Sequence, residues 1–234
     1  MSTKLRENVW WMALSGVNAY LVDDGGTITL IDAGTPLDRR AIEQGITSAV
    51  GTIAEVDRIL LTHFDIDHVG TLHRIEALHA PIYVGAADSQ YLTRERRPPW
   101  RNHKGAFQRL IDVVRQSPSM PTETVADGDR IGSFTAYSTP GHTPGHTAFV
   151  SEALSAGFLG DLVRESDGDL VAPPAMICYD HEQARQSIVD LADRAPDFEA
   201  ACPGHGVPFK EGGSQRLVDC AERIKRSRSA ATPA

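Results

Sequence analysis

A cluster of ionisable residues directly after an apolar segment is the strongest constraint on this chain. Residues 57–62 (DRILLT) are typical of a buried strand, and His63, Asp65, Asp67 and His68 follow at once. Four ionisable side chains so close together are costly to bury without a compensating charge. The end of a strand is also where α/β folds build their sites. The stretch therefore favours a divalent cation at a sheet edge, the alternative being an N-capping Asp67 among surface histidines.

Hydrophobic periodicity along the chain alternates between strand and helix patterns, which indicates an α/β layered fold. We read one domain over residues 1–234, because nothing marks a linker. The expected strands are 8–14, 17–23, 27–31, 57–62, 81–85, 122–126, 133–138, 147–151, 155–159 and one near 198–202. The expected helices are 36–50, one from about Asp67 to Leu78, 105–116, 180–194 and 214–227.

Residues 86–121 differ in character and read as a helical and loop excursion from these layers. The segment 94–104 (RERRPPWRNHK) is basic with one tryptophan, and 105–116 has the apolar face of an amphipathic helix. A solvated loop is one interpretation of the basic segment. The other is functional, as a lid over the site or a dimer contact.

Three later loops carry further potential metal ligands. They hold His142 in a Gly-His-Thr-Pro-Gly sequence, Asp161 after Leu159-Gly160, and His205 in Pro203-Gly204-His205-Gly206. Each follows a short apolar strand, and the glycines and prolines favour tight, rigid loops. Four such loops are therefore expected to meet at one edge of a layered fold.

This ordered series resembles the metallo-β-lactamase superfamily, whose signature is H-x-H-x-D-H followed by a histidine, an aspartate and a final histidine. The resemblance spans about residues 17–206 and includes Leu30-Ile31-Asp32-Ala33-Gly34, which is similar to the first motif of the family. It implies a four-layer αββα sandwich of two mixed β-sheets flanked by helices. It also implies a site with two divalent metal ions, with Asp32 beside it as a structural residue.

Carried over by position, the resemblance implies seven ligands in two sets joined by a bridge. They are His63, Asp65 and His142 for the first ion, Asp67, His68 and His205 for the second, and Asp161 as the bridge. By the same pattern, His146 is not a ligand.

Asp65 departs from the family signature, because it stands where the second histidine is usual. It leaves three outcomes open: Asp65 ligates through oxygen, the first ion binds weakly, or the site holds one ion. Zinc is the expected metal, and a carboxylate in place of imidazole shifts preference towards Mn(II) or Fe(II). A member with impaired metal binding would be a binding or regulatory protein rather than an enzyme.

The chemistry implied by such a site is hydrolysis by water without a covalent intermediate. A metal lowers the pKa of bound water from about 15.7 towards 7. Asp67 is the expected catalytic residue, since it can orient the nucleophile as well as bind metal. A small-molecule ester, lactone or thioester is the expected substrate, with a lactonase-like enzyme first and a phosphodiesterase or other phosphoesterase second.

Composition limits the partners and the compartment. The net charge is −8 and the pI about 5.6, which argues against nucleic acids and anionic membranes. No stretch approaches the roughly 20 apolar residues that span a bilayer, and no signal peptide is apparent. Three cysteines do not make a disulfide framework, so we expect a cytoplasmic protein. The expected partners are a small-molecule substrate and, as one alternative, a second copy of the chain in a homodimer.

Overall fold

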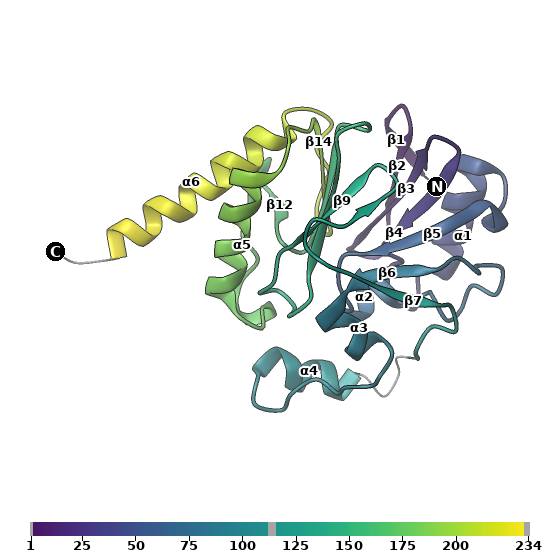
Figure 1. The fold of residues 1–234 in the computed structure, drawn as a ribbon, viewed down its shortest axis with the longest axis horizontal. Coiled ribbons are helices and arrows are strands. Elements are labelled where there is room, and N and C mark those ends of the chain that lie inside the picture. The colour runs from purple at the N-terminus through teal and green to yellow at the C-terminus, as the bar shows by residue number, and fades with distance from the viewer. Residues whose placement is uncertain (1, 112–115, 232–234) are drawn as a thin grey trace.

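Two mixed β-sheets stack face to face, and helices cover the outer side of each (Figure 1). The computed structural model describes residues 2–111 and 116–231. This is the four-layer αββα arrangement that the resemblance implied. Among these residues, no helix combines the length and the apolar character that crossing a membrane requires.

The first sheet has seven strands in chain order, antiparallel from β1 to β4 and parallel from β4 to β7. They are β1 (Thr3–Arg6), β2 (Val9–Ala13), β3 (Asn18–Asp24), β4 (Thr27–Ile31), β5 (Val56–Leu61), β6 (Ile82–Gly85) and β7 (Thr122–Val125).

The second sheet has the strand order β14-β11-β10-β9-β8, and a two-stranded hairpin, β12–β13, follows β11. Its strands are β8 (Arg130–Ile131), β9 (Phe134–Ser138), β10 (Thr147–Ser151), β11 (Ala156–Gly160) and β14 (Ala200–Pro203), and the hairpin strands are β12 (Arg164–Ser166) and β13 (Asp169–Val171).

Six α-helices and two 3-10 turns complete the described part of the chain. The helices are α1 (Arg39–Val50), α2 (Ile66–Val69), α3 (Ala86–Leu92), α4 (His103–Ile111), α5 (His181–Arg194) and α6 (Gly213–Ala231), and the turns are η1 (Ile53–Glu55) and η2 (Ala175–Ile177).

Alternation along the strands separates the core into layers. In β3, Leu21 faces α1, whereas Tyr20 and Val22 point between the two sheets. Phe149 and Phe158 fill the space between the sheets from the other side. A third apolar cluster lies between the second sheet and the helices α5 and α6. Each sheet is thus buried on both faces, which explains its nearly continuous apolar strands.

The structure corrects several expectations about elements. The helix expected from Asp67 to Leu78 ends at Val69, and turns follow it. The backbone nitrogen of Gly70 donates to the carbonyl of Gly34 at 2.8 Å and so leaves the hydrogen-bond pattern of the helix. The helix α3 and the strands β1, β8, β12 and β13 form where none was expected. The last residues expected for the helix 105–116 lie outside the described part of the chain.

Candidate metal centre

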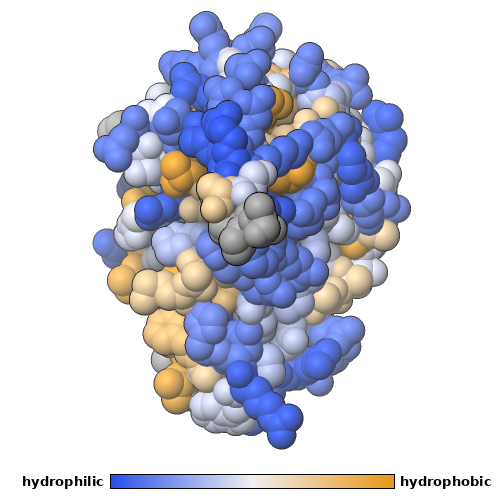
Figure 2. Space-filling view, turned by 90° about the vertical axis from the view of Figure 1, so that its left-hand side faces the viewer, coloured by the Kyte–Doolittle hydropathy of each residue, from blue (hydrophilic) through white to orange (hydrophobic). Residues whose placement is uncertain are grey.

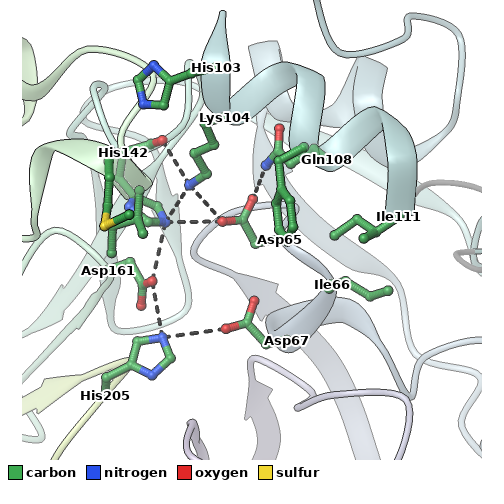
Figure 3. A pocket seen from close by; sticks show the side chains of 13 residues that line it. Asp65, Ile66, Asp67, His103, Lys104, Gln108, Ile111, His142, Asp161 and His205 are labelled. Carbon is green, nitrogen blue, oxygen red and sulfur yellow. Dashed lines mark hydrogen bonds and ion pairs between the residues drawn. The ribbon is translucent and has the colours of Figure 1, made fainter.

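The seven side chains expected as ligands come together at one edge of the sandwich, from four loops. Figure 3 shows five of them: Asp65, Asp67, His142, Asp161 and His205. The strands β9, β11 and β14 run in the same direction, so their carboxyl ends lie at the same edge of the second sheet. The carboxyl end of β5 brings the segment 63–68 to the same place from the first sheet. The layered topology therefore gathers residues up to 142 positions apart in the chain: His63, Asp65, Asp67, His68, His142, Asp161 and His205.

Asp161 lies at the centre of the cluster. Its Oδ2 atom is 3.2 Å from His142 Nε2 and 3.2 Å from His205 Nε2, and its Oδ1 atom is 3.3 Å from His68 Nε2. One carboxylate thus faces both sets of histidines, which is the position expected of a bridge.

The second set is compact and opens to the surface. The ligand atoms of Asp67, His68 and His205 all lie within 4.8 Å of one another. His68 is fully buried, whereas the side chains of Asp67 and His205 are about one third exposed. An ion held by these three residues would therefore remain accessible to a substrate.

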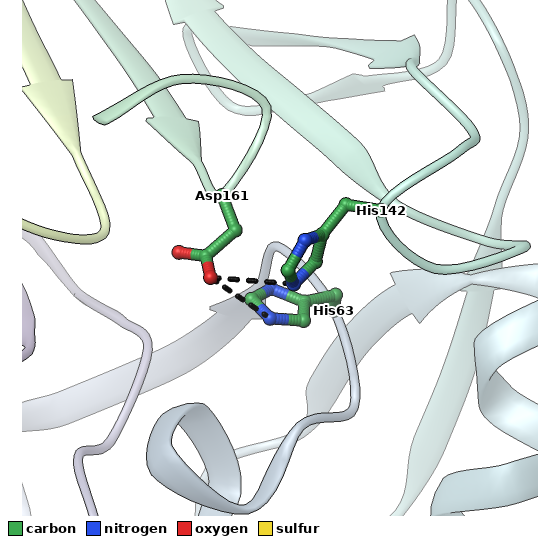
Figure 4. Close-up of side chains that lie close together, drawn as sticks. All are labelled: His63, His142 and Asp161. Carbon is green, nitrogen blue, oxygen red and sulfur yellow. Dashed lines mark ion pairs between the residues drawn. The ribbon is translucent and has the colours of Figure 1, made fainter. Parts of the chain in front are cut away.

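The first set is buried more deeply. His63 and His142 offer ligand atoms within 4.8 Å of each other and of Asp161 (Figure 4). Asp65 lies beside them, with Oδ2 3.1 Å from His142 Nε2 and 3.5 Å from His63 Nε2. The three side chains expected to bind the first ion, His63, Asp65 and His142, are therefore close together.

Hydrogen bonds behind the rings orient three of the four histidines. His68 Nδ1 donates to Asp32 at 2.9 Å, and His205 Nδ1 donates to the carbonyl of Gly16 at 2.7 Å. His63 Nδ1 donates to the hydroxyl of Thr62 at 3.0 Å, and that hydroxyl donates to Asp32. Each ring then presents the lone pair of Nε2 to the centre, as carboxylate-backed metal ligands do.

The donor set fits a divalent cation on two observations. The buried atoms His63 Nε2, His68 Nε2 and Asp161 Oδ1 have no hydrogen-bond partner among the described residues. Buried polar atoms are otherwise almost always paired. Gly204 packs so closely that a Cβ there would lie 2.1 Å from Asp161 Oδ1, which explains the glycine before His205.

The electrostatics of the centre also favour a cation. Burial acts to lower the pKa of His68, but the carboxylates of Asp161 and Asp32 outweigh it and raise this pKa well above its ordinary value. Burial likewise acts to raise the pKa of Asp161, and the neighbouring histidines hold it well below its usual range. The carboxylates therefore favour positive charge at Nε2 of His68, which either a proton or a metal ion can supply.

Three buried residues near the centre were not expected from the sequence: Asp88, Lys104 and Gln108. Asp88, on α3, accepts hydrogen bonds from Thr143 Oγ1 and Gly145 N, both at 2.6 Å, and so holds the loop of His142 in place. Burial raises the pKa of Asp88 to about 6. No motif marks these residues, because they come from helices in the polar segment after residue 85.

His146 is in neither of the two groups of ligand atoms that lie within 4.8 Å of one another. It is fully buried, and its Nδ1 atom bonds with the hydroxyl of Thr139 at 2.8 Å. His73 and His79 lie at or near the surface of the turns that follow α2.

A cavity of about 320 Å³ opens over the centre between α4 and η2. Its floor is polar, with Asp67, Asp161 and His205, and its walls are apolar (Figure 3). The wall residues are Ile66, Phe107, Ile111, Met176 and Ile177. On the face shown in Figure 2, hydrophobic side chains gather in the lower part of the molecule, at the height of α4, whereas the upper part is mostly hydrophilic.

This chain is similar to known metallo-hydrolases in sequence. The model of the metallo-beta-lactamase superfamily matches residues 13–205. Two proteins of Bacillus subtilis (strain 168) align over nearly their whole lengths. The uncharacterized protein YobT is 31% identical over 94% of this chain and 97% of its own, and the probable metallo-hydrolase YflN is 28% identical over 95% and 96%.

Two further likenesses bear on the chemistry. The hydroxyacylglutathione hydrolase of Stenotrophomonas maltophilia (strain R551-3) is 27% identical over 66% of this chain and 47% of its own. Among solved structures, TTHA1623 in a di-iron-bound form is similar with a TM-score of 0.64 and 27% identity, over 86% of this chain and 93% of that one.

Proposed function

We propose that this chain, which belongs to the metallo-β-lactamase superfamily, is a metal-dependent hydrolase of small carboxylic esters, lactones or thioesters. The observation that carries the proposal is the cluster of imidazole and carboxylate groups at the floor of an open cavity. Asp67, His68, His205 and Asp161 are the residues that would hold the ion. We expect zinc, with Fe(II) and Mn(II) as competing ions, because two imidazoles and two carboxylates suit all three.

A divalent ion bound there supplies a Lewis acid and an acidified water molecule. The protein's own part is to position the reactants. Asp67 lies on the floor of the cavity, and burial acts to raise its pKa, but His68 and His205 outweigh this effect and lower it. Its carboxylate is therefore ionised at neutral pH and can accept a hydrogen bond that orients the attacking water.

Direct attack by water is favoured by the state of the cysteines. Burial raises the pKa of Cys178 to about 11 and that of Cys202 still further, so both are neutral thiols at neutral pH. Neither is among the residues that line the cavity. No covalent acyl intermediate is needed on these grounds.

The lining of the cavity supports a substrate with an apolar part. Phe107 and Met176 form an exposed apolar rim over the polar floor. The phosphoesterase alternative is tested by the phosphodiester in the substrate panel. The likeness to a hydroxyacylglutathione hydrolase supports thioesters as one of the substrate classes.

The test is a hydrolysis panel on metal-depleted and metal-restored protein. The panel contains a short-chain and a long-chain ester, a lactone, a thioester and a phosphodiester. We expect turnover of the carboxylic substrates only after metal is restored. Turnover of the phosphodiester alone would move the assignment to a phosphoesterase, and metal-independent turnover, or none with any substrate, would contradict the proposal.

Variants of the ligands give the matched comparison. His68→Ala and His205→Ala should lose both bound metal and hydrolysis, because each removes a proposed ligand. His79→Ala should retain both, since His79 is an exposed histidine in the turns after α2. Full activity in either ligand variant would refute the assignment.

A further inference from the structure

The two sides of the centre differ in one respect that the motif does not reveal. On the first side, Lys104 of α4 reaches in among the expected ligands (Figure 3). We propose that the ammonium group of Lys104 takes the place of the first metal ion, so that the centre binds one divalent ion, at Asp67, His68, His205 and Asp161. This inference rests on the proposed function and specifies its metal site.

Lys104 is seated in a complete set of acceptors. Its Nζ atom lies 2.7 Å from Asp65 Oδ2, 2.7 Å from His142 Nε2 and 3.0 Å from the carbonyl oxygen of His142. An ammonium group has three N–H donors, so all three have a partner. The residue is only 6% exposed, and its charge therefore depends on these contacts.

The contact with His142 excludes a metal ion at the same atom. Nε2 of a neutral imidazole has a single lone pair, and it either accepts from Lys104 or binds a metal. A zinc ion would lie about 2.0–2.1 Å from that nitrogen, within the space that the ammonium group takes.

Asp65 is also fully engaged by the protein. Its Oδ2 atom accepts from Lys104, and its Oδ1 atom accepts from the side-chain amide of Gln108. Lys104 and Gln108 are four residues apart on α4 and so lie on the same face of the helix. The hydroxyl of Tyr179 donates to the amide oxygen of Gln108, which fixes the amide with its nitrogen towards Asp65.

The support behind the rings differs for one histidine of the first side, His142. His63, His68 and His205 each donate from Nδ1 to an oxygen, as metal-bound histidines do. His142 is the exception, since its buried Nδ1 atom has no hydrogen-bond partner among the described residues. Its ring is instead contacted at Nε2, by Lys104, Asp65 and Asp161.

Lys104 thus explains why position 65 holds an aspartate instead of the histidine that is usual in the family. A carboxylate at position 65 pairs with an ammonium group, which an imidazole at that position would not do as strongly. Lys104 also lines the cavity, so its positive charge lies beside the substrate. In hydrolysis this charge can stabilise, without a direct hydrogen bond, the negative charge that develops on the carbonyl oxygen.

The experiment counts metal ions rather than turnover. The full-length protein and three variants are dialysed against excess zinc, and bound zinc is measured by elemental analysis. The variants are Asp65→His/Lys104→Met, which restores the family motif and removes the ammonium group, His63→Gln and Arg109→Met. Arg109 lies on the same helix over the ring of Trp100, so its variant controls for loss of positive charge from α4.

We expect one equivalent in the unaltered protein and in Arg109→Met, and two in the double variant. His63→Gln should retain one equivalent, because His63 belongs to the side that Lys104 fills. Two equivalents in the unaltered protein would overturn the inference while leaving a metal-dependent hydrolase intact. No bound zinc would overturn both, and one equivalent in a folded double variant would show that Lys104 does not exclude the ion. If the double variant does not fold, the count in the unaltered protein decides.

Discussion

Asp32 is the residue on which the orientation of the centre depends most. It accepts hydrogen bonds from Thr62 N at 2.9 Å, from Thr62 Oγ1 at 2.7 Å and from His68 Nδ1 at 2.9 Å. Its backbone has a φ of 56°, in the left-handed region, where aspartate and asparagine are tolerated better than most residues. Asp32 therefore fixes the tautomer of His68 and, through Thr62, that of His63.

Asp32→Asn should weaken metal binding about 10- to 100-fold. Asparagine can adopt the same backbone conformation, but its amide group places a donor against one of the donors that Asp32 now accepts. Affinity is measured by competition with a metal-binding dye. Asp38→Asn is the control, because Asp38 is also buried and accepts from Ser15 and Thr35, away from the centre. Equal affinities for the unaltered protein and the Asp32 variant would contradict the role.

At this scale, the sequence predicted the residues that a motif specifies and missed those that packing supplies. The side chains His63 to His68 are adjacent in the chain, and the other expected ligands follow strands in short Gly-containing loops. Lys104, Gln108 and Asp88 come from α3 and α4, where ordinary polar side chains give no signal. Only the fold shows that the polar face of α4 lies against Asp65.

At the scale of elements, the two sheets are joined at the edge through a partly buried ion pair. Asp24, at the end of β3, accepts from Arg58 of β5 and from the backbone nitrogen of Ser133, which precedes β9, at 3.0 Å. Burial acts to raise the pKa of Asp24, but the hydrogen bonds from Ser133 and Arg58 outweigh it and lower this pKa. The carboxylate therefore links the first sheet to the second.

Asp24→Asn should lower the free energy of unfolding at pH 7 by about 1–3 kcal/mol. The pKa of Asp24 is lower in the folded than in the unfolded state, so its stabilisation is present above the unfolded value of about 3.9 and is lost as the pH falls further. The free energy of unfolding is measured in urea at pH 7 and near pH 3.5. Asp193→Asn is the control, because Asp193 forms an exposed ion pair with Lys225. If the difference in the free energy of unfolding between Asp24→Asn and the unaltered protein is as large at the lower pH as at pH 7, the ionised carboxylate does not have this role.

The helix α4 forms one wall of the cavity, and Phe107 is its most exposed aromatic residue there. Phe107→Ser should raise KM for a long-chain acyl ester about 10-fold, from the loss of roughly 1.5 kcal/mol of apolar contact, with kcat little changed. Leu110→Ser is the matched control: Leu110 is 65% exposed on the same helix and does not line the cavity. Equal KM values for the two variants would show that α4 does not bind the acyl chain.

The elements were predictable to the extent that periodicity determines them. The strands around the site were placed within a few residues because their apolar runs and flanking turns are strong local signals. The helix after Asp67 was predicted too long, since Leu72, Ile75 and Leu78 have helical spacing but are buried from a series of turns. The hydrogen bond from Gly70 N to the carbonyl of Gly34, at which the helical pattern stops, is a tertiary contact that periodicity does not reveal.

At the scale of the whole molecule, the centre connects the two halves of the sandwich. His63, Asp67 and His68 belong to the first sheet, and Asp161 and His205 to the second. A metal ion coordinated from both sheets binds the folded state but not the unfolded state. Its binding therefore stabilises the fold.

Metal removal should therefore lower the thermal stability. At a free metal concentration of 100 times Kd, binding contributes about 2.7 kcal/mol, which corresponds to about 5–10 °C in Tm for a chain of this size. Scanning calorimetry with and without a chelator measures it. His205→Gln, which lacks a ligand, should show a much smaller difference, and an equal Tm with and without metal in the unaltered protein would argue against binding across the sheets.

The most direct test of the account is the position of the bound ion. Crystals grown with zinc and measured on both sides of the zinc absorption edge locate it by anomalous scattering. The account predicts one strong peak among Asp67, His68, His205 and Asp161, and Lys104 density in contact with Asp65 and His142. Two peaks of equal strength, one of them in contact with His63, Asp65 and His142, or no peak at the centre, would contradict it.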